Sequence, residues 1–387
     1  MNRSTAETMP GRQDDTHQET PAPSARRSQS YWAIVWKQLK KNRPGMLGLW
    51  VIVGLMTIAG LAPILANDRP IVVRYKGELQ FPAFTTYVDV WVPWKSMRYE
   101  LKSWKMKDNP PYFPFSEYYP ELEGRTWKEL KDSPELTFGV WPPIPWHPNQ
   151  FDATALKLRP TRETGHYLGT DDQGRDVLSR LIHGTVVAMI VGLVAMGLAS
   201  FIGVSLGLIA GYMGGWVDLV LSRITEVVMC FPTFFLIIAV IAFLEPSIVN
   251  IMMVIGLVGW TGIFRLIRGE VLRARSLDYV TAAQALGTPT WRIMFRQILP
   301  NAISPVFVSI AFGIAGAVLT ETSLSFLGFG DTSVPSWGET VSQGRAYVSQ
   351  GLWHLTVYPG LAIFFTLTAF NLFGQGLRDA MDPKLRH

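Results

Sequence analysis

The sequence predicts an all-α polytopic membrane protein with six transmembrane helices and a large insert between the first two. Hydrophobic residues make up 48% of the 387 residues, whereas charged residues make up only 17%. The apolar residues are gathered in six runs that can cross a bilayer, which takes about 20 helical residues. The charged residues are concentrated in the first 44 positions, in the insert 67–184 and in short loops. This separation is typical of a multi-pass membrane protein.

Two segments of different character precede the first run. Residues 1–30 are rich in Ser, Thr, Gln, Asp and Pro, which predicts a disordered cytosolic tail. Residues 31–44 combine Trp and Tyr with Lys and Arg, as is typical of an interfacial helix. The predicted spans are 45–66, 185–215, 227–244, 246–264, 303–328 and 353–374. The last five form a core over 185–376, in which the glycines of the second span predict close helix packing.

The distribution of basic residues predicts how these spans are oriented in the membrane. They flank the first span on its N-terminal side, fill the loop 265–302 and recur in the C-terminal tail 377–387. The loop 329–352 holds a single basic residue, Arg345. By the positive-inside rule, both termini and the loop 265–302 are expected in the cytosol. With six spans, the insert 67–184 is then extracytoplasmic.

The insert is unusual in composition. Between residues 67 and 165 it is rich in aromatic residues and proline, too aromatic for disorder and too rich in proline for long helices. We expect a small irregular domain or a cover over a pore mouth, in which residues 108–124 form a loop with an aromatic face. Such a segment suits either contact with a partner or substrate, or a purely structural cap.

The end of the insert carries Asp and Arg at i,i+4 spacing. The two pairs are Asp171–Arg175 and Asp176–Arg180. Side chains four residues apart lie on the same face of a helix. The spacing therefore predicts an interfacial helix over 171–180 with two ion pairs.

The most distinctive stretch is 278–301, within the predicted cytosolic loop. Residues 279–286 predict a short helix, and Gly287 is suited to end it with a positive φ. Pro289 predicts the start of a second helix, because proline is favoured near the first position of a helix. Residues 291–299 predict that second helix. The pair is either a docking site for a soluble partner or an interfacial hairpin on the lipid headgroups.

One acid, Glu321, lies well inside the predicted fifth span. An ionised side chain at the bilayer centre costs about 2.5–3.5 kcal/mol on insertion scales, so Glu321 should face protein or water. It is either a pore or gate residue or a structural clamp hydrogen-bonded to Ser323 or a neighbour. Arg223 and Glu226 are expected to pair at i,i+3 spacing.

Several chemistries are excluded by missing motifs. The sequence contains no G-x-x-x-x-G-K-[ST], so the chain is not expected to bind ATP in the usual way. It contains neither G-x-S-x-G nor H-E-x-x-H, which argues against a hydrolase. With one cysteine, Cys230, and scattered histidines, no zinc site is expected. We therefore expect a non-catalytic chain that binds no cofactor. The single buried acid also argues against an autonomous channel or secondary transporter.

One pattern in the loop resembles a known family. Two alanines, three further residues, a glycine and a later Leu-Pro pair are similar to the EAA loop of ABC importer permeases. Here they are Ala282, Ala283, Gly287, Leu299 and Pro300. Thr281 stands where that motif usually begins with glutamate. The resemblance implies that a groove of a cytosolic ATPase receives the first helix, with contacts from these residues and from Asp278.

Further motifs extend the resemblance along the chain. The stretches 168–184, 321–330 and 376–386 resemble the C-type permeases of dipeptide and oligopeptide importers. Within that group, 65–82 is similar to permeases of the importers for broad peptides and microcin C. The resemblance covers residues 31–66 and 166–387 and implies the fold of a type I ABC importer permease.

The resemblance also implies a function and partners. The chain is expected to be a permease subunit of the bacterial inner membrane that forms half of a pathway for peptides or peptide-like compounds. Its expected partners are a second, homologous permease, an extracytoplasmic peptide-binding protein, and ATPase subunits or a fused ATPase that hold ATP and Mg; no nucleic acid is expected. Permeases for nickel or metal chelates look much alike and remain an alternative. Met196 and Met252 suit either a weakly selective pathway or ordinary packing.

Overall fold

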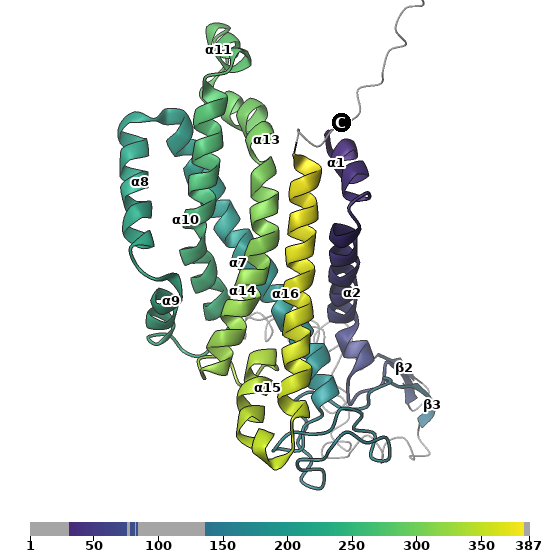
Figure 1. Cartoon of the computed structure of the whole chain (residues 1–387). Helices are drawn as coiled ribbons and strands as arrows, with labels where there is room; N and C mark the ends of the chain where they lie inside the picture. Colours follow the sequence, from purple (N-terminus) through teal and green to yellow (C-terminus); the bar gives the residue numbers. More distant parts are fainter. Residues whose placement is uncertain (1–30, 76–77, 82, 84–135, 383–387) are drawn as a thin grey trace, which may run out of the picture.

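The chain folds into a bundle of long helices (Figure 1). The computed structural model describes residues 31–75, 78–81, 83 and 136–382. The predicted tail 1–30, the aromatic loop 108–124 and residues 383–387 lie outside this part. Within it, five helices are long and apolar enough to cross a membrane: α2 (Arg43–Leu65), α7 (Val177–Met213), α10 (Ile248–Arg275), α14 (Ser304–Phe326) and α16 (His354–Met381).

The segment predicted as the third span is not one straight helix. Helices α8 (Gly215–Met229) and α9 (Thr233–Ile241) meet at a bend of 82°. Pro232 lies at the bend; it has no backbone N–H and disfavours helical backbone in the residue before it. The prediction of a single span over 227–244 is therefore wrong. Counted as one crossing, the bent pair brings the described residues to six candidate spans.

Helix α7 packs along α10 over much of its length and also contacts α2, α14 and α16. Three glycines at four-residue spacing, Gly203, Gly207 and Gly211, face α10. A Cβ atom added at Gly207 would lie 2.7 Å from the carbonyl oxygen of Phe264, so the two backbones are in close contact. Small residues allow this approach, which supplies dispersion contacts where lipid provides no hydrophobic driving force. The prediction of close packing is confirmed.

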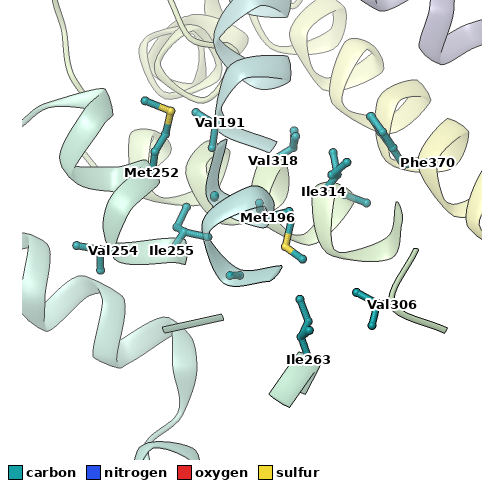
Figure 2. Close-up of a cluster of buried hydrophobic side chains, with 14 of the residues drawn as sticks. Val191, Met196, Met252, Val254, Ile255, Ile263, Val306, Ile314, Val318 and Phe370 are labelled. Carbon is teal, nitrogen blue, oxygen red and sulfur yellow. The ribbon is translucent and has the colours of Figure 1, made fainter. Parts of the chain in front are cut away.

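The main apolar core lies between α7, α10 and α14. Figure 2 shows Met196 of α7 near Ile314 of α14, and Met252 of α10 in the same cluster. Met196 is 9% exposed and Met252 is 2% exposed. These two methionines therefore serve ordinary helix packing.

The N-terminal segment lies against the end of α16. Helix α1 (Tyr31–Leu39) buries Val35 and Leu39 with Ala380 of α16. Asn42 caps α2 by accepting a hydrogen bond from the backbone N–H of Gly45 at 2.9 Å. Its amide also donates to the carboxylate of Asp379 at 2.9 Å. The start of α2 and the end of α16 therefore lie at the same end of the bundle as α11 (Asp278–Ala285), which we call the α11 end (Figure 1).

The opposite end carries a small antiparallel sheet, and we call it the sheet end. Its strands are β1 (Val72–Tyr75), β2 (Glu78–Gln80) and β3 (Leu136–Val140), in the order β2-β1-β3. Val73 pairs with Gln80 on one side and with Gly139 on the other. Helix α15 (Trp337–Gly344) and the 3-10 turn Arg345–Gln350 lie at this end as well (Figure 1). The part of the insert that the structure describes thus combines a sheet with irregular segments.

Candidate functional site

The candidate site is the segment 278–301 at the α11 end. Helix α10 continues as far as Arg275, so the predicted loop 265–302 begins inside a helix. Only Ser276 and Leu277 separate α10 from α11. Asp278 occupies the first turn of α11, where the helix dipole favours a carboxylate. Helix α11 is thus joined almost directly to the end of a long apolar helix.

Helix α11 ends as the sequence predicts. Gly287 has a φ of 70°, in the left-handed region that favours glycine. Its N–H donates to the carbonyl of Gln284 at 2.9 Å, and the N–H of Thr288 donates to the carbonyl of Ala283 at 3.0 Å. These bonds satisfy carbonyl groups at the helix end. Nothing lies within 4 Å of a Cβ placed on Gly287, so this glycine is required by backbone conformation and not by space.

The second helix of the pair is irregular. It starts as α12 (Thr290–Arg292) after Pro289, continues as a π-helix over Ile293–Ile298 and ends as α13 (Leu299–Ala302). The N–H of Leu299 donates to the carbonyl of Met294, five residues earlier. Pro300 follows directly, and its ring and missing N–H disfavour a regular α-turn. The wider π-turn accommodates this proline.

The helix pair buries one face and exposes the other. Val280 of α11 and Ile298 of the π-helix are fully buried. Three large apolar side chains point outward instead: Leu286 is 85% exposed, Trp291 55% and Phe295 54%. We call these three residues the apolar cap. Helix α11 stands at the tip of the bundle (Figure 1), so the apolar cap is placed where a partner can reach it.

The structure divides the seven residues predicted for coupling. Leu299 is partly buried, and Ala283 is buried in the main core. Ala283 is therefore not on the exposed face of the helix pair, because side chains of its own chain bury it. The hydroxyl of Thr281 donates to the carbonyl of Asp278 at 2.9 Å, within its own helix. The five exposed members are Asp278, Thr281, Ala282, Gly287 and Pro300.

Sequence reasoning missed the apolar cap. The signal was present, since Leu286, Trp291 and Phe295 are large apolar residues close to Gly287 in a largely polar segment. Helical periodicity alone did not separate them from the buried Ile293 and Ile298. Only the packing of the second helix shows which of its apolar residues face outward.

The helix pair is connected to the bundle at several points. The amide of Gln284 donates to the hydroxyl of Tyr212, near the end of α7, at 3.3 Å. The chain connects α11 to α10 at one side and the second helix to α14 at the other. A force on the apolar cap would therefore reach α10 and α14 directly through the backbone.

Glu321 does not lie on an exposed surface of this chain. It is 1% exposed, and its carboxylate accepts a hydrogen bond from the hydroxyl of Ser325 at 2.7 Å. The hydroxyl of Ser323 donates to the carbonyl of Leu319 instead. Of the predicted partners, Ser323 or a neighbour, the neighbour Ser325 forms the hydrogen bond, one helical turn after Glu321. The geometry favours the structural interpretation of Glu321.

The predicted interfacial helix over 171–180 is wrong. Helix α7 begins only at Val177, and Asp176 caps it by accepting from the backbone N–H of Ser179 at 2.7 Å. The free N–H groups of the first turn attract a carboxylate, which competes with an i,i+4 ion pair. The same carboxylate contacts the imidazole of His166 at 2.9 Å, with both side chains buried.

The arginines of this region form a buried network at the sheet end. The predicted pair Asp171–Arg175 is confirmed at 2.7 Å, and Arg175 also donates to Gln343 at 2.7 Å. Arg180 does not pair with Asp176 as predicted but with Glu339 of α15, at 3.0 Å. Burial raises the pKa of the Glu339 carboxyl above its usual range, and the guanidinium of Arg180 opposes this rise. The network joins the start of α7 to α15.

Helix α8 carries two further ion pairs. The predicted pair Arg223–Glu226 is confirmed at 2.5 Å and is exposed. It lies within α8 and not at the end of a span, because α8 starts at Gly215. Asp218 pairs with Arg268 of α10. Among the described residues, no group of three or more His, Cys, Asp or Glu side chains is arranged to hold a metal ion.

Taken together, the fold and the site define a multi-pass membrane protein with a helix pair presented at one end. Comparison with known families gives the particular class. The family model described as "Binding-protein-dependent transport system inner membrane component" matches residues 203–387. A second, "N-terminal TM domain of oligopeptide transport permease C", matches residues 30–81. The chain belongs to this family of inner membrane permeases of ABC transporters, which are non-catalytic subunits.

Individual relatives agree with this assignment. The peptidoglycan transport system permease protein YejE of Agrobacterium fabrum is 31% identical over 375 residues, covering 90% of this chain and 92% of the relative. The inner membrane ABC transporter permease protein YejE of Escherichia coli is 31% identical over 369 residues, with 90% and 96% covered. The dipeptide transport system permease protein DppC of Alkalihalophilus pseudofirmus is 39% identical over 222 residues, with 57% and 73% covered. The resemblance to C-type permeases of peptide importers is confirmed.

Proposed function

We propose that this chain is the transmembrane permease subunit of an ATP-driven importer for peptides or peptide-like compounds and forms half of the translocation pathway. Two similar chains that cover most of this sequence carry names of a peptidoglycan permease and an ABC transporter permease. A third carries the name of a dipeptide permease. The names of the peptidoglycan permease and the dipeptide permease share one substrate chemistry, peptides or peptide-like fragments.

The observation that carries the mechanism is the exposure of the apolar cap. Large apolar side chains that are more than half exposed on a segment outside the apolar spans are candidate contacts for a protein partner. Leu286 directly follows α11, which the chain connects to α10. Trp291 and Phe295 lie on the second helix, which the chain connects to α14. A partner that closes and opens on this cap would tilt these two long helices. The sequence lacks the nucleotide-binding motif G-x-x-x-x-G-K-[ST], so ATP and Mg are assigned to that partner.

The topology follows from charge. Basic residues gather at the α11 end, in 31–44 and 265–302 and at Arg378 near the end of α16. The positive-inside rule places that end, with both termini, in the cytosol. Six crossings result when α8 and α9 form one bent span, and 67–184 is then an extracytoplasmic insert before the core 185–376. The location is the bacterial inner membrane.

The roles of the site residues follow the exposure of each. Asp278, Thr281 and Ala282 are assigned to the surface that the ATPase contacts, together with the apolar cap. Gly287 ends α11 so that the second helix can fold back, and Pro300 shapes that helix through the π-turn. Ala283 and Leu299 hold the pair on the bundle. Glu321 is assigned to a structural clamp inside α14.

The proposed partners are ATPase subunits or a fused ATPase, a second, homologous permease and an extracytoplasmic peptide-binding protein. The test is affinity purification of the tagged chain in mild detergent, with mass spectrometry of the co-purified proteins. Leu286→Asp is expected to remove the ATPase while the second permease stays bound, because a carboxylate would then be buried without a partner. Leu79→Asp, an exposed apolar residue at the sheet end, is the matched control and should retain both.

Recovery of the chain alone or as a homo-oligomer, across several gentle detergents, would favour an autonomous channel or secondary transporter and overturn the proposal. The substrate class is tested separately in cells that lack other peptide importers. Uptake of labelled di- to oligopeptides that depends on this chain supports a peptide importer. Uptake of nickel or a metal chelate without peptide uptake would assign the alternative substrate.

A further inference from the structure

A pocket of about 480 Å³ lies between α8 and α10. Its volume is within the range of small-molecule sites, about 300–1,000 Å³. Arg265 and Arg268 of α10 line it together with Glu226, whereas Met229, Cys230 and Phe264 supply apolar wall. The pocket therefore combines a cationic part with an apolar part on two helices that contact each other only weakly.

The cationic part has one charge without a partner. Arg268 is paired with Asp218, and Glu226 is paired with Arg223 at 2.5 Å. Within each of these two pairs, the positive and the negative charge cancel. Arg265 is exposed and makes no hydrogen bond or ion pair with any residue that the structure describes. The pocket therefore has a net charge of one positive unit, carried by a guanidinium with free N–H donors.

Neighbouring residues give the level of Arg265 along the bundle. The next residue, Leu266, lines a second pocket with Arg378, Met381 and Asp382, at the very end of α16. Asp379, in the same turn of α16, bonds Asn42 at the start of α2. Helix α14 thus starts and α16 ends near this level, whereas α7 and α10 continue past it. We take this level as that of the lipid headgroups.

We propose that this pocket binds the phosphate of an anionic phospholipid from the leaflet at the α11 end. Arginine suits phosphate because its planar N–H groups match the oxygens geometrically. Basic pockets between transmembrane helices at the cytosolic surface bind anionic headgroups. Met229 in the pocket wall is 41% exposed, and Phe231, two residues further along the chain, is 55% exposed, so an acyl chain can cover this apolar surface. The lipid would fill the gap between α8 and α10 and stabilise the position of α8.

The test is lipid retention by the full chain with its co-purifying subunits, measured by native mass spectrometry. The complex is purified in mild detergent and titrated with phosphatidylglycerol or with phosphatidylcholine of the same acyl chains. Phosphatidylglycerol is expected to bind selectively. Arg265→Gln should weaken this binding about fivefold, the effect of about 1 kcal/mol per basic residue near anionic lipid. Arg273→Gln is the matched control, since this side chain is on the same helix and 80% exposed.

Arg265→Lys distinguishes shape from charge, and an intermediate affinity for phosphatidylglycerol is expected. Equal retention of phosphatidylglycerol by the wild type and Arg265→Gln, both eluting as intact complexes, would overturn the proposal. So would equal binding of phosphatidylcholine, which would indicate an apolar groove only. Displacement of the lipid by inorganic phosphate would assign the pocket to a free anion. Displacement by a peptide with a free carboxylate, and not by its amide, would assign it to the transported substrate.

Discussion

The guanidinium of Arg180, on α7, lies 3.0 Å from the carboxylate of Glu339, on α15. The side chain of Arg180 is 0% exposed and that of Glu339 is 11% exposed. The pair joins two elements 159 residues apart in the sequence. Arg180 also donates to the carbonyl of Pro148 at 3.4 Å, and the indole of Trp337 donates to the carbonyl of Leu181 at 3.0 Å. The start of α7, α15 and the end of the insert therefore form one unit.

Breaking this pair should destabilise the protein more than removing both partners. Glu339→Gln leaves a buried guanidinium without its counter-charge, and a loss of about 3–5 kcal/mol is expected. The double variant Arg180→Met with Glu339→Leu should recover most of that loss, because both charges are removed together. Thermal unfolding of the purified chain in detergent measures the effect.

The exposed pair on α8 provides the control for that experiment. Arg223→Gln removes one partner of a pair whose side chains are 69% and 59% exposed, so a change below about 1 kcal/mol is expected. A Glu339→Gln variant with the same melting temperature as Arg223→Gln would show that the buried pair does not hold α15 in place.

Gly287 should tolerate asparagine better than valine. Its φ of 70° costs L-residues about 1–2 kcal/mol, whereas asparagine adopts this region readily. Gly287→Val is expected to reach the membrane in normal amount but to lose transport and the transport-linked part of ATP hydrolysis. Gly287→Asn should retain most of both. Normal transport by the valine variant would contradict a coupling role for this helix end.

The contact of α7 with α10 should be sensitive to a single methyl group. Gly207→Ala places a Cβ 2.7 Å from the carbonyl oxygen of Phe264, and a loss of about 1–3 kcal/mol is expected from overpacking. Gly197→Ala on the same helix meets nothing within 4 Å. It should be neutral or slightly stabilising, since alanine favours a helix over glycine. Equal melting temperatures for the two variants would show that α7 and α10 are less closely packed.

Glu321 should accept an amide but not a leucine. Glu321→Gln keeps an acceptor for the hydroxyl of Ser325, so abundance and transport should remain near those of the wild type. Glu321→Leu leaves that hydroxyl buried without an acceptor, at a cost of about 1–3 kcal/mol. Ser323→Ala is the control, because Ser323 is only partly buried and its hydroxyl bonds only a carbonyl of its own helix. A Glu321→Gln variant that folds normally but fails to transport would instead assign the charge to a pore or gate.

Local patterns predicted those features of the chain that depend on short stretches of sequence. Apolar runs marked the helices α2, α7, α10, α14 and α16, because burial of a helix in lipid depends on its own composition. The positive φ of Gly287 was predictable from the residue type, since few residues other than glycine adopt a positive φ. The pairs Asp171–Arg175 and Arg223–Glu226 were predictable because their partners are close in the sequence, although only Arg223 and Glu226 lie on a helix.

Features that join distant residues were decided only by the tertiary structure. The i,i+4 spacing predicted that Arg180 pairs with Asp176. In the structure Arg180 is buried against α15 and pairs with Glu339, whereas Asp176 caps the start of α7. Periodicity could not tell that Ala283 packs inward and Leu286 outward, because exposure depends on what a second helix covers. The sequence by itself determined the membrane class and the position of the helix pair 278–301. Tertiary packing decided which side chains of that segment a partner can reach, since only packing removes the others from solvent.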